Sequence, residues 1–92
     1  MGKYTVKLVG TSREDLKEIY MSGNKVLVRK IEILFVELSE HPQTGTGKPE
    51  VLKHQPGVWS RRLDKKNRML YSIFENTVTV YVLSVKSHYG DK

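Results

Sequence analysis

Three side chains, far apart in the sequence, carry groups that could cleave RNA without a metal ion. Glu50 is a lone carboxylate between Lys48 and Lys53, Arg68 lies further along, and His88 comes late in the chain. The 2′-hydroxyl of RNA can attack its own phosphate, given a base at the 2′-oxygen, an acid at the leaving 5′-oxygen and cations around phosphorus. Glu50, His88 and Arg68 could fill these roles. On spacing alone, the commoner arrangements are an ion pair between Glu50 and a lysine and a frayed terminal position for His88.

Other catalytic chemistries lack their sequence signatures. The histidines His41, His54 and His88 lie far apart without metal-ligand spacing, and the chain has no cysteine. The segment 45–48 lacks the glycine spacing of a phosphate-binding loop, and no serine lies in a nucleophile elbow. We therefore expect neither a metal site nor a cofactor.

The positive charge is concentrated in one block. Residues 48–68 contribute +5 of the formal net charge of +6, and the isoelectric point is about 9.7. Such a block is typical of proteins that bind nucleic acid. A solvated basic face or an acidic protein partner is the alternative.

The segment 59–63 alternates in a way that separates two arginines. In a strand, Trp59, Arg61 and Leu63 would share one face, and Ser60 and Arg62 the other. We expect Trp59 to pack in the core or at an edge, although stacking on a base is the alternative. Arg62 would then face RNA, while Arg61 would lie over Trp59 or meet a partner.

Two helices should precede a sheet. Ser12 resembles an N-cap for a short helix that stops near residues 23–24. Residues 25–40 carry an apolar stripe of helical period, and the pair 41–42 (His-Pro) should end that helix. The stripe consists of Leu27, Ile31, Leu34, Phe35 and Leu38.

Strand character begins at residues 4–9 and returns after a loop at 43–47. The later expected strands cover 50–53, 58–63, 69–75 and 77–85, and 77–83 should form a hairpin with 69–74. This order predicts an α+β fold, β-α-α-β-β-β(-β), with two N-terminal helices packed on a largely antiparallel twisted sheet. We expect residues 1–92 to form a single domain.

We expect no contact with a membrane. No apolar run approaches the roughly 18 residues of a membrane-spanning helix, and the first residues do not resemble a signal peptide. A soluble, cytoplasmic protein is therefore predicted.

Four segments together resemble one family. They are 47–54 (Gly-Lys-Pro-Glu-Val-Leu-Lys-His), 59–62 (Trp-Ser-Arg-Arg), 67–71 (Asn-Arg-Met-Leu-Tyr) and 88–89 (His-Tyr). In order and spacing they resemble the YoeB/Txe toxins of the RelE superfamily. The resemblance is strong over residues 40–89 and weak over 1–24. It implies a RelE-like fold and a ribosome-dependent endoribonuclease that cuts messenger RNA in the A site of the 70S ribosome.

The resemblance also implies partners. The toxin would be silenced by a cognate antitoxin, would form a homodimer, and would bind operator DNA only together with the antitoxin. Two departures stand out. The family's aromatic residues in the first strand and helix are missing here, and Gly90, Asp91 and Lys92 follow the His-Tyr pair.

Site residues follow from the matched positions. The resemblance implies Glu50 as general base, His88 as general acid and Arg68 as the arginine that stabilises the transition state. Tyr89 matches a tyrosine that orients the substrate or the histidine. Phosphate-binding positions match Lys48, Lys53 and Arg62. We expect Glu50 and His88 at neighbouring strand ends, and a bell-shaped dependence of rate on pH.

Two other functions are open on this scaffold. A RelE-fold protein could act by binding another protein, as ParE-type toxins bind gyrase, since fold alone does not fix function. A non-catalytic nucleic-acid-binding module would need only the basic block. Neither alternative has a use for Glu50, Arg68 and His88 together.

Overall fold

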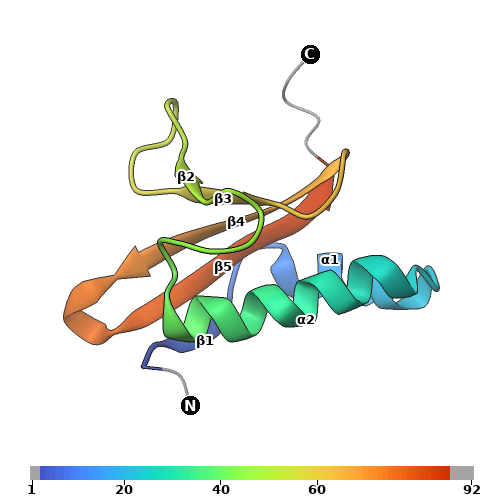
Figure 1. The fold of residues 1–92 in the computed structure, drawn as a ribbon, viewed down its shortest axis with the longest axis horizontal. Coiled ribbons are helices and arrows are strands. Elements are labelled where there is room, and N and C mark those ends of the chain that lie inside the picture. The colour runs from blue at the N-terminus through green and yellow to red at the C-terminus, as the bar shows by residue number, and fades with distance from the viewer. Residues whose placement is uncertain (1–2, 88–92) are drawn as a thin grey trace.

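Five strands form one sheet in the computed structural model, which describes residues 3–87. The elements are β1 (Thr5–Leu8), α1 (Ser12–Met21), α2 (Lys25–Glu40), β2 (Glu50–Val51), β3 (Trp59–Arg62), β4 (Asn67–Phe74), a 3-10 turn (Glu75–Thr77) and β5 (Thr79–Ser87) (Figure 1). The strand order is β1-β5-β4-β3-β2, and only the β1–β5 pair is parallel. The predicted α+β fold, with two helices and a largely antiparallel sheet, is confirmed.

The long hairpin of β4 and β5 occupies the middle of the sheet. It pairs Asn67 with Ser87 at one end and Phe74 with Thr79 at the other, with a bulge at residues 70–71. The predicted pairing of 69–74 with the following strand is therefore confirmed. However, β3 and β4 lie between β2 and β5. The strand of Glu50 is therefore not next to β5, the strand that precedes His88, contrary to the expectation; His88 itself lies outside the described residues.

Helix α2 has the bounds that its apolar stripe predicts. The side chain of Asn24 accepts a hydrogen bond from the N–H of Leu27 at 3.1 Å, which satisfies one free donor at the helix start. Every fourth or third residue along one face is buried, and Phe35 is half-buried at its margin. The helix ends at Glu40, two residues before Pro42.

Helix α1 begins differently from the expectation. Ser12 lies inside the helix, where its buried hydroxyl donates to the carbonyl of Val9 at 2.6 Å, so Thr11 takes the N-cap position. The Asp15 carboxylate accepts from the Thr11 hydroxyl at 2.8 Å and from the N–H of Val85 at 3.0 Å. Asp15 thereby anchors α1 to the last part of β5.

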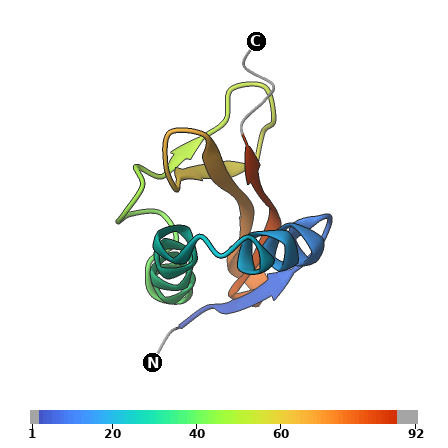
Figure 2. The ribbon, with the colours of Figure 1, turned by 90° about the vertical axis from the view of Figure 1, so that its right-hand side faces the viewer.

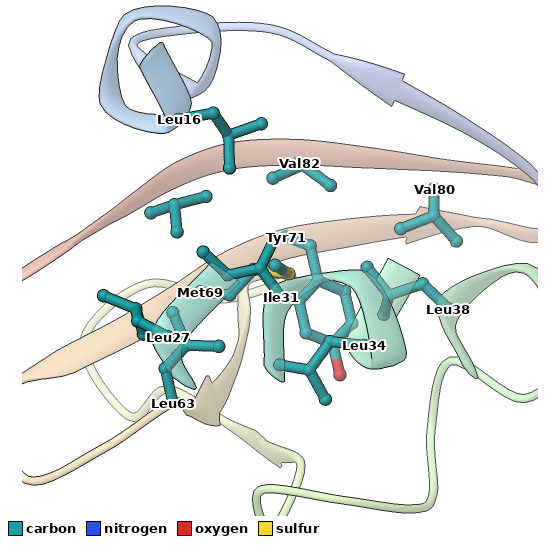
Figure 3. Packing of buried hydrophobic residues seen from close by; sticks show 11 residues of the cluster. Leu16, Leu27, Ile31, Leu34, Leu38, Leu63, Met69, Tyr71, Val80 and Val82 are labelled. Atoms are coloured by element: carbon teal, nitrogen blue, oxygen red, sulfur yellow. The ribbon is translucent and has the colours of Figure 1, made fainter. Parts of the chain in front are cut away.

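The core lies between the two helices and one face of the sheet (Figure 2). Leucine and isoleucine side chains from the helices meet the inward-facing residues of β4 and β5, and the ring of Tyr71 lies among them (Figure 3). The fully buried members are Ile31, Leu34, Leu38, Met69, Tyr71, Val80, Val82 and Val85. Because strand residues alternate, their neighbours point to the opposite face, which the helices leave open. Within residues 3–87, no helix is long and apolar enough to cross a membrane.

Candidate functional site

Three cationic residues stand side by side on the open face of the sheet. Arg62 of β3 pairs with Arg68 of β4, which in turn pairs with Lys86 of β5. Directly paired residues on adjacent strands lie about 4.5–5.5 Å apart. Arg62 is exposed and the other two are half-buried. We call Arg62, Arg68 and Lys86 the basic row.

Glu50 lies beside this row. It pairs with Ser60, whose hydroxyl lies 3.4 Å from a guanidinium nitrogen of Arg68. The Glu50 carboxylate is 3.8 Å from the same nitrogen, and the two side chains are 64% and 24% exposed. This is a loose ion pair that leaves acceptors on the carboxylate and donors on the guanidinium for a third group. The structure thus brings Glu50 to Arg68 rather than to a lysine.

The loop before β2 brings Lys48 toward the basic row. The N–H of Arg62 donates to the carbonyl of Gly47 at 2.8 Å, so the loop runs along the edge of β3. A Cβ at Gly47 would lie 2.6 Å from the Arg62 carbonyl oxygen, and Gly47 has a φ of +87°, so this approach requires glycine. Lys48 follows directly and is exposed, as is Lys53 just past β2.

His88 and Tyr89 lie outside the described residues. The last described residue, Ser87, pairs with Asn67, next to Arg68 on β4. The chain therefore leaves the described part at the end of the sheet where the basic row stands. The roles predicted for His88 and Tyr89 stay predictions.

The turn between β3 and β4 is held rigidly. A carboxylate oxygen of Asp64 accepts from the N–H of Lys66 at 2.8 Å and of Asn67 at 2.6 Å. Burial acts to raise the pKa of Asp64, but these hydrogen bonds outweigh it, so the pKa lies below its usual value. Lys30 of α2 donates to the carbonyl of Leu63 at 3.2 Å. The two strand ends that carry Arg62 and Arg68 are thus fixed to each other and to α2.

Arg61 has a role that the sequence did not indicate. Its side chain is fully buried, and the guanidinium donates to the Tyr71 hydroxyl at 3.0 Å and to Glu37 at 2.6 Å. It also donates to three loop carbonyls, those of His41 at 3.0 Å, Thr44 at 2.7 Å and Thr46 at 3.3 Å. The expectation that Arg61 lies over Trp59 or meets a partner is wrong.

Trp59 packs as expected, at the margin of the core. It is half-buried, and its ring stacks on Tyr71 with centroids 6.4 Å apart. The Arg61 guanidinium lies 5.8 Å from the centroid of the same tyrosine ring. The aromatic partner of Arg61 is therefore Tyr71, which sequence alternation alone could not distinguish from Trp59.

Two of the groups that accept from Arg61 make further hydrogen bonds. Glu37 also accepts from the N–H and the hydroxyl of Thr46, at 2.8 and 2.7 Å. Burial acts to raise the pKa of Glu37, but the hydrogen bonds from Thr46 and Arg61 outweigh it and lower the pKa. Burial raises the pKa of Tyr71, so its hydroxyl stays protonated and donates to the carbonyl of Pro42 at 2.8 Å. This network, Arg61–Glu37–Thr46–Tyr71, is called the clamp below.

Residues 3–87 contain no group of three or more histidine or acidic side chains placed to hold a metal ion. The chemistry that the described site offers is a carboxylate acceptor beside several cations. Such a site suits a phosphodiester, whose charge the cations can neutralise.

Comparison with known proteins identifies relatives of this chain. A family described as YoeB-like toxin of bacterial type II toxin-antitoxin system matches residues 11–89. A toxin YoeB from Synechocystis is 32% identical over 71 residues, which cover 76% of this chain and 80% of the relative.

Two solved structures from Staphylococcus aureus share the fold. A YoeB dimer superposes with a TM-score of 0.79 and 28% identity, covering 95% of this chain and 99% of that one. A YoeB–YefM complex superposes with a TM-score of 0.76 and 31% identity, covering 94% of this chain and 98% of that one.

Proposed function

The chain belongs to the YoeB-like toxins of bacterial type II toxin-antitoxin systems, and on this premise we propose that it is an endoribonuclease that cleaves messenger RNA in the ribosomal A site. One observation carries the proposal. Glu50 lies 3.8 Å from Arg68, exposed on the open face and next to a row of cations. Attack by a 2′-hydroxyl needs a base for its proton and a cation for the charge that builds on the phosphate, and the carboxylate and the guanidinium can supply these two groups.

In the proposed reaction, Glu50 accepts the proton of the 2′-hydroxyl as that oxygen attacks the adjacent phosphorus. The bond from phosphorus to the 5′-oxygen breaks, and His88 gives its proton to that oxygen. The products are a 2′,3′-cyclic phosphate and a free 5′-hydroxyl. Arg68 stabilises the negative charge that builds on the phosphate in the transition state. This chemistry needs no cofactor.

Binding and orientation fall to the remaining candidates. Lys48 and Lys53 flank β2, Arg62 pairs with Arg68, and all three are exposed. We assign them to the phosphates of neighbouring nucleotides. Tyr89, one residue after His88, would orient the substrate or the histidine. The wide exposure of the site suits a substrate presented by a large particle such as the 70S ribosome.

Partners follow from the relatives. One neighbour is a YoeB dimer and another a complex of YoeB with YefM. We propose that this chain likewise forms a homodimer and is silenced by a cognate antitoxin, together with which it binds operator DNA. A bacterial cytoplasmic location follows from a target on the ribosome.

The test adds purified protein to a cell-free bacterial translation reaction and maps new 5′ ends of the messenger by primer extension. We expect cuts only while ribosomes translate, with a loss of about 10²–10⁴-fold in rate for Glu50→Gln and for His88→Ala. The pH profile of the wild type should be bell-shaped, and Glu50→Gln should remove its acidic limb.

Two results would contradict the proposal. If translation stops without cuts, the protein acts by binding another target, as a gyrase poison does on this scaffold. If neither cuts nor inhibition follow, the basic row serves simple nucleic-acid binding.

A further inference from the structure

Most of the hydrogen bonds of the clamp end on a loop. The fork of Arg61 ends on the carbonyls of His41, Thr44 and Thr46, all in the connection between α2 and β2. Thr46 is fixed a second time, because its N–H and its hydroxyl both donate to Glu37. The loop is therefore tied to β3 through Arg61 and to α2 through Glu37.

The strand that follows this loop has little to hold it. Strand β2 has two residues, Glu50 and Val51, both exposed at the edge of the sheet, and it pairs with β3 alone. Between Thr46 and Glu50 the chain passes Lys48 in a left-handed conformation with a φ of +53°. The direction in which the chain reaches Glu50 is thus set by where the clamp places Thr46 and by the hydrogen bond from the N–H of Arg62 to the carbonyl of Gly47.

A buried ion pair is a costly way to hold a fold together. Well-packed apolar side chains of similar volume often stabilise as much or more. A guanidinium offers something else, since five donors in a rigid fork can fix several carbonyls at once. In the clamp, three of these contacts go to carbonyls of one loop. What the arginine adds over an apolar residue is a fixed loop conformation.

We propose that Arg61 is a positioning residue, which through the clamp holds the 41–47 loop so that Glu50 stays in place beside Arg68. The inference rests on the proposed function in assigning Glu50 as the base. It predicts that loosening the clamp slows cleavage by displacing Glu50. A misplacement of about 1 Å at a reacting group can cost roughly 100-fold in rate.

Two mild variants loosen the clamp without emptying the core. Thr46→Val removes one hydroxyl donor to Glu37 and keeps the side-chain shape. Arg61→Lys keeps a cation for Glu37, but it has three donors in place of five and cannot span the loop carbonyls. The matched control is Thr79→Val, because Thr79 is buried, donates to the carbonyl of Thr77 at 2.9 Å and lies at the far end of β4 and β5.

The first measurement is amide hydrogen exchange, which reports local opening. We expect two N–H groups that join this segment to β3, that of Arg62 on the Gly47 carbonyl and that of Leu52 on the Val58 carbonyl, to exchange about tenfold faster in Thr46→Val and in Arg61→Lys than in the wild type. Thr79→Val should leave them unchanged. Unchanged exchange in both clamp variants would overturn the proposal, and this result does not depend on any catalytic activity.

The second measurement is a double-mutant cycle on the cleavage rate. We expect Thr46→Val to slow cleavage about tenfold, Arg61→Lys about 100-fold and Thr79→Val less than twofold. In a Glu50→Gln background the clamp variants should change the residual rate less than twofold, because the group that they position is gone.

If the clamp only stabilises the fold, the clamp variants should lower the cleavage rate by the same factor with and without the Glu50→Gln substitution. That result would contradict the proposal. If Glu50→Gln itself leaves the rate unaltered, positioning Glu50 has no catalytic meaning and the proposal fails as well. If the wild type does not cut RNA at all, the proposed function fails, and the exchange measurement alone decides whether the clamp holds this strand.

Discussion

Two arginine–glutamate pairs lie on opposite faces of the same sheet, and they differ in almost every physical respect. Arg61 and Glu37 are 2.6 Å apart, and the arginine is wholly buried. Arg68 and Glu50 are 3.8 Å apart, and both are partly open to solvent. The first pair has its hydrogen-bonding capacity used within the protein, whereas the second has capacity left over.

This difference indicates that the first pair holds the fold together and that the second can still bind a third group. A closed pair is poorly placed to bind a substrate, because its donors and acceptors already make six hydrogen bonds to other groups of the protein. An open pair contributes little stability, since exposed ion pairs contribute about 0–1 kcal/mol. We therefore expect substitutions in the first pair to lower stability, besides any effect that they have on the position of Glu50. Substitutions in the second pair should lower the cleavage rate with little effect on stability.

The largest expected effect is on stability, at Arg61. Arg61→Met should lower the free energy of unfolding by about 3–5 kcal/mol, because it leaves the Glu37 carboxylate without its cation and three loop carbonyls without their guanidinium donor. Arg68→Met should cost less than about 1 kcal/mol. Urea denaturation of both variants checks this, and equal losses would remove the distinction between the pairs.

The next effect is on chemistry, at Arg68. Arg68→Met should lower the cleavage rate by about 10²–10³-fold, the usual loss when one group that stabilises transition-state charge is removed. Lys65→Met is the control, because it removes one exposed cation from the turn beyond the basic row. Rates from primer extension that fall equally in both variants would mean that overall charge matters and the position of Arg68 does not.

A third effect depends on pH. Glu37→Gln should lower the free energy of unfolding by about 1.5–3 kcal/mol at pH 7, since hydrogen bonds to a charged acceptor are stronger than those to a neutral one. The pKa of Glu37 is lower in the folded protein than in the unfolded chain. Its stabilisation is therefore complete above the unfolded value and is lost as the pH falls through the folded value.

Urea denaturation of the wild type and of Glu37→Gln at several acid pH values checks this. The difference between their free energies of unfolding should disappear as the pH falls. Glu40→Gln, at the exposed end of the same helix, controls for the loss of a carboxylate. A gap that stays constant down to the lowest pH would contradict the expectation.

The smallest effect distinguishes the neighbours Arg61 and Arg62. Arg62→Met should change stability by no more than about 0.5 kcal/mol, because Arg62 is exposed. Its loss should make the dependence of RNA affinity on log salt shallower by about 0.7, the value for one phosphate contact on a single strand. Binding titrations at several salt concentrations measure this, with Lys17→Met on α1 as the control that should leave the slope alone.

Sequence periodicity predicted the elements and faces well. The stripe along residues 25–40 defined α2, and the alternation from Trp59 to Leu63 separated Arg61 from Arg62 onto opposite faces. Periodicity predicts which residues share a face of a strand or helix. It does not predict how far that face is buried or which residues pack against it. The burial of Arg61 depends on Glu37 and on a loop whose course no local pattern specifies.

The site was predicted from matched motifs, and its geometry was not. Motifs selected Glu50 and Arg68, which the fold places 3.8 Å apart. Turn residues predict only which consecutive strands pair. The parallel β1–β5 pair joins segments that are distant in the sequence, so turns could predict neither this pair nor the separation of β2 from β5.

The central place of β5 has a consequence for folding. This strand is synthesised after the other four, yet it lies between β1 and β4 and supplies Val80, Val82 and Val85 to the core. Contacts between segments so far apart in the chain close late and slow the search for the native state. While β5 is still unmade, β1 has no partner strand and the core is incomplete, so the nascent chain cannot assemble the basic row, to which β5 contributes Lys86. The cationic surface of the open face therefore forms only when nearly the whole domain has been translated.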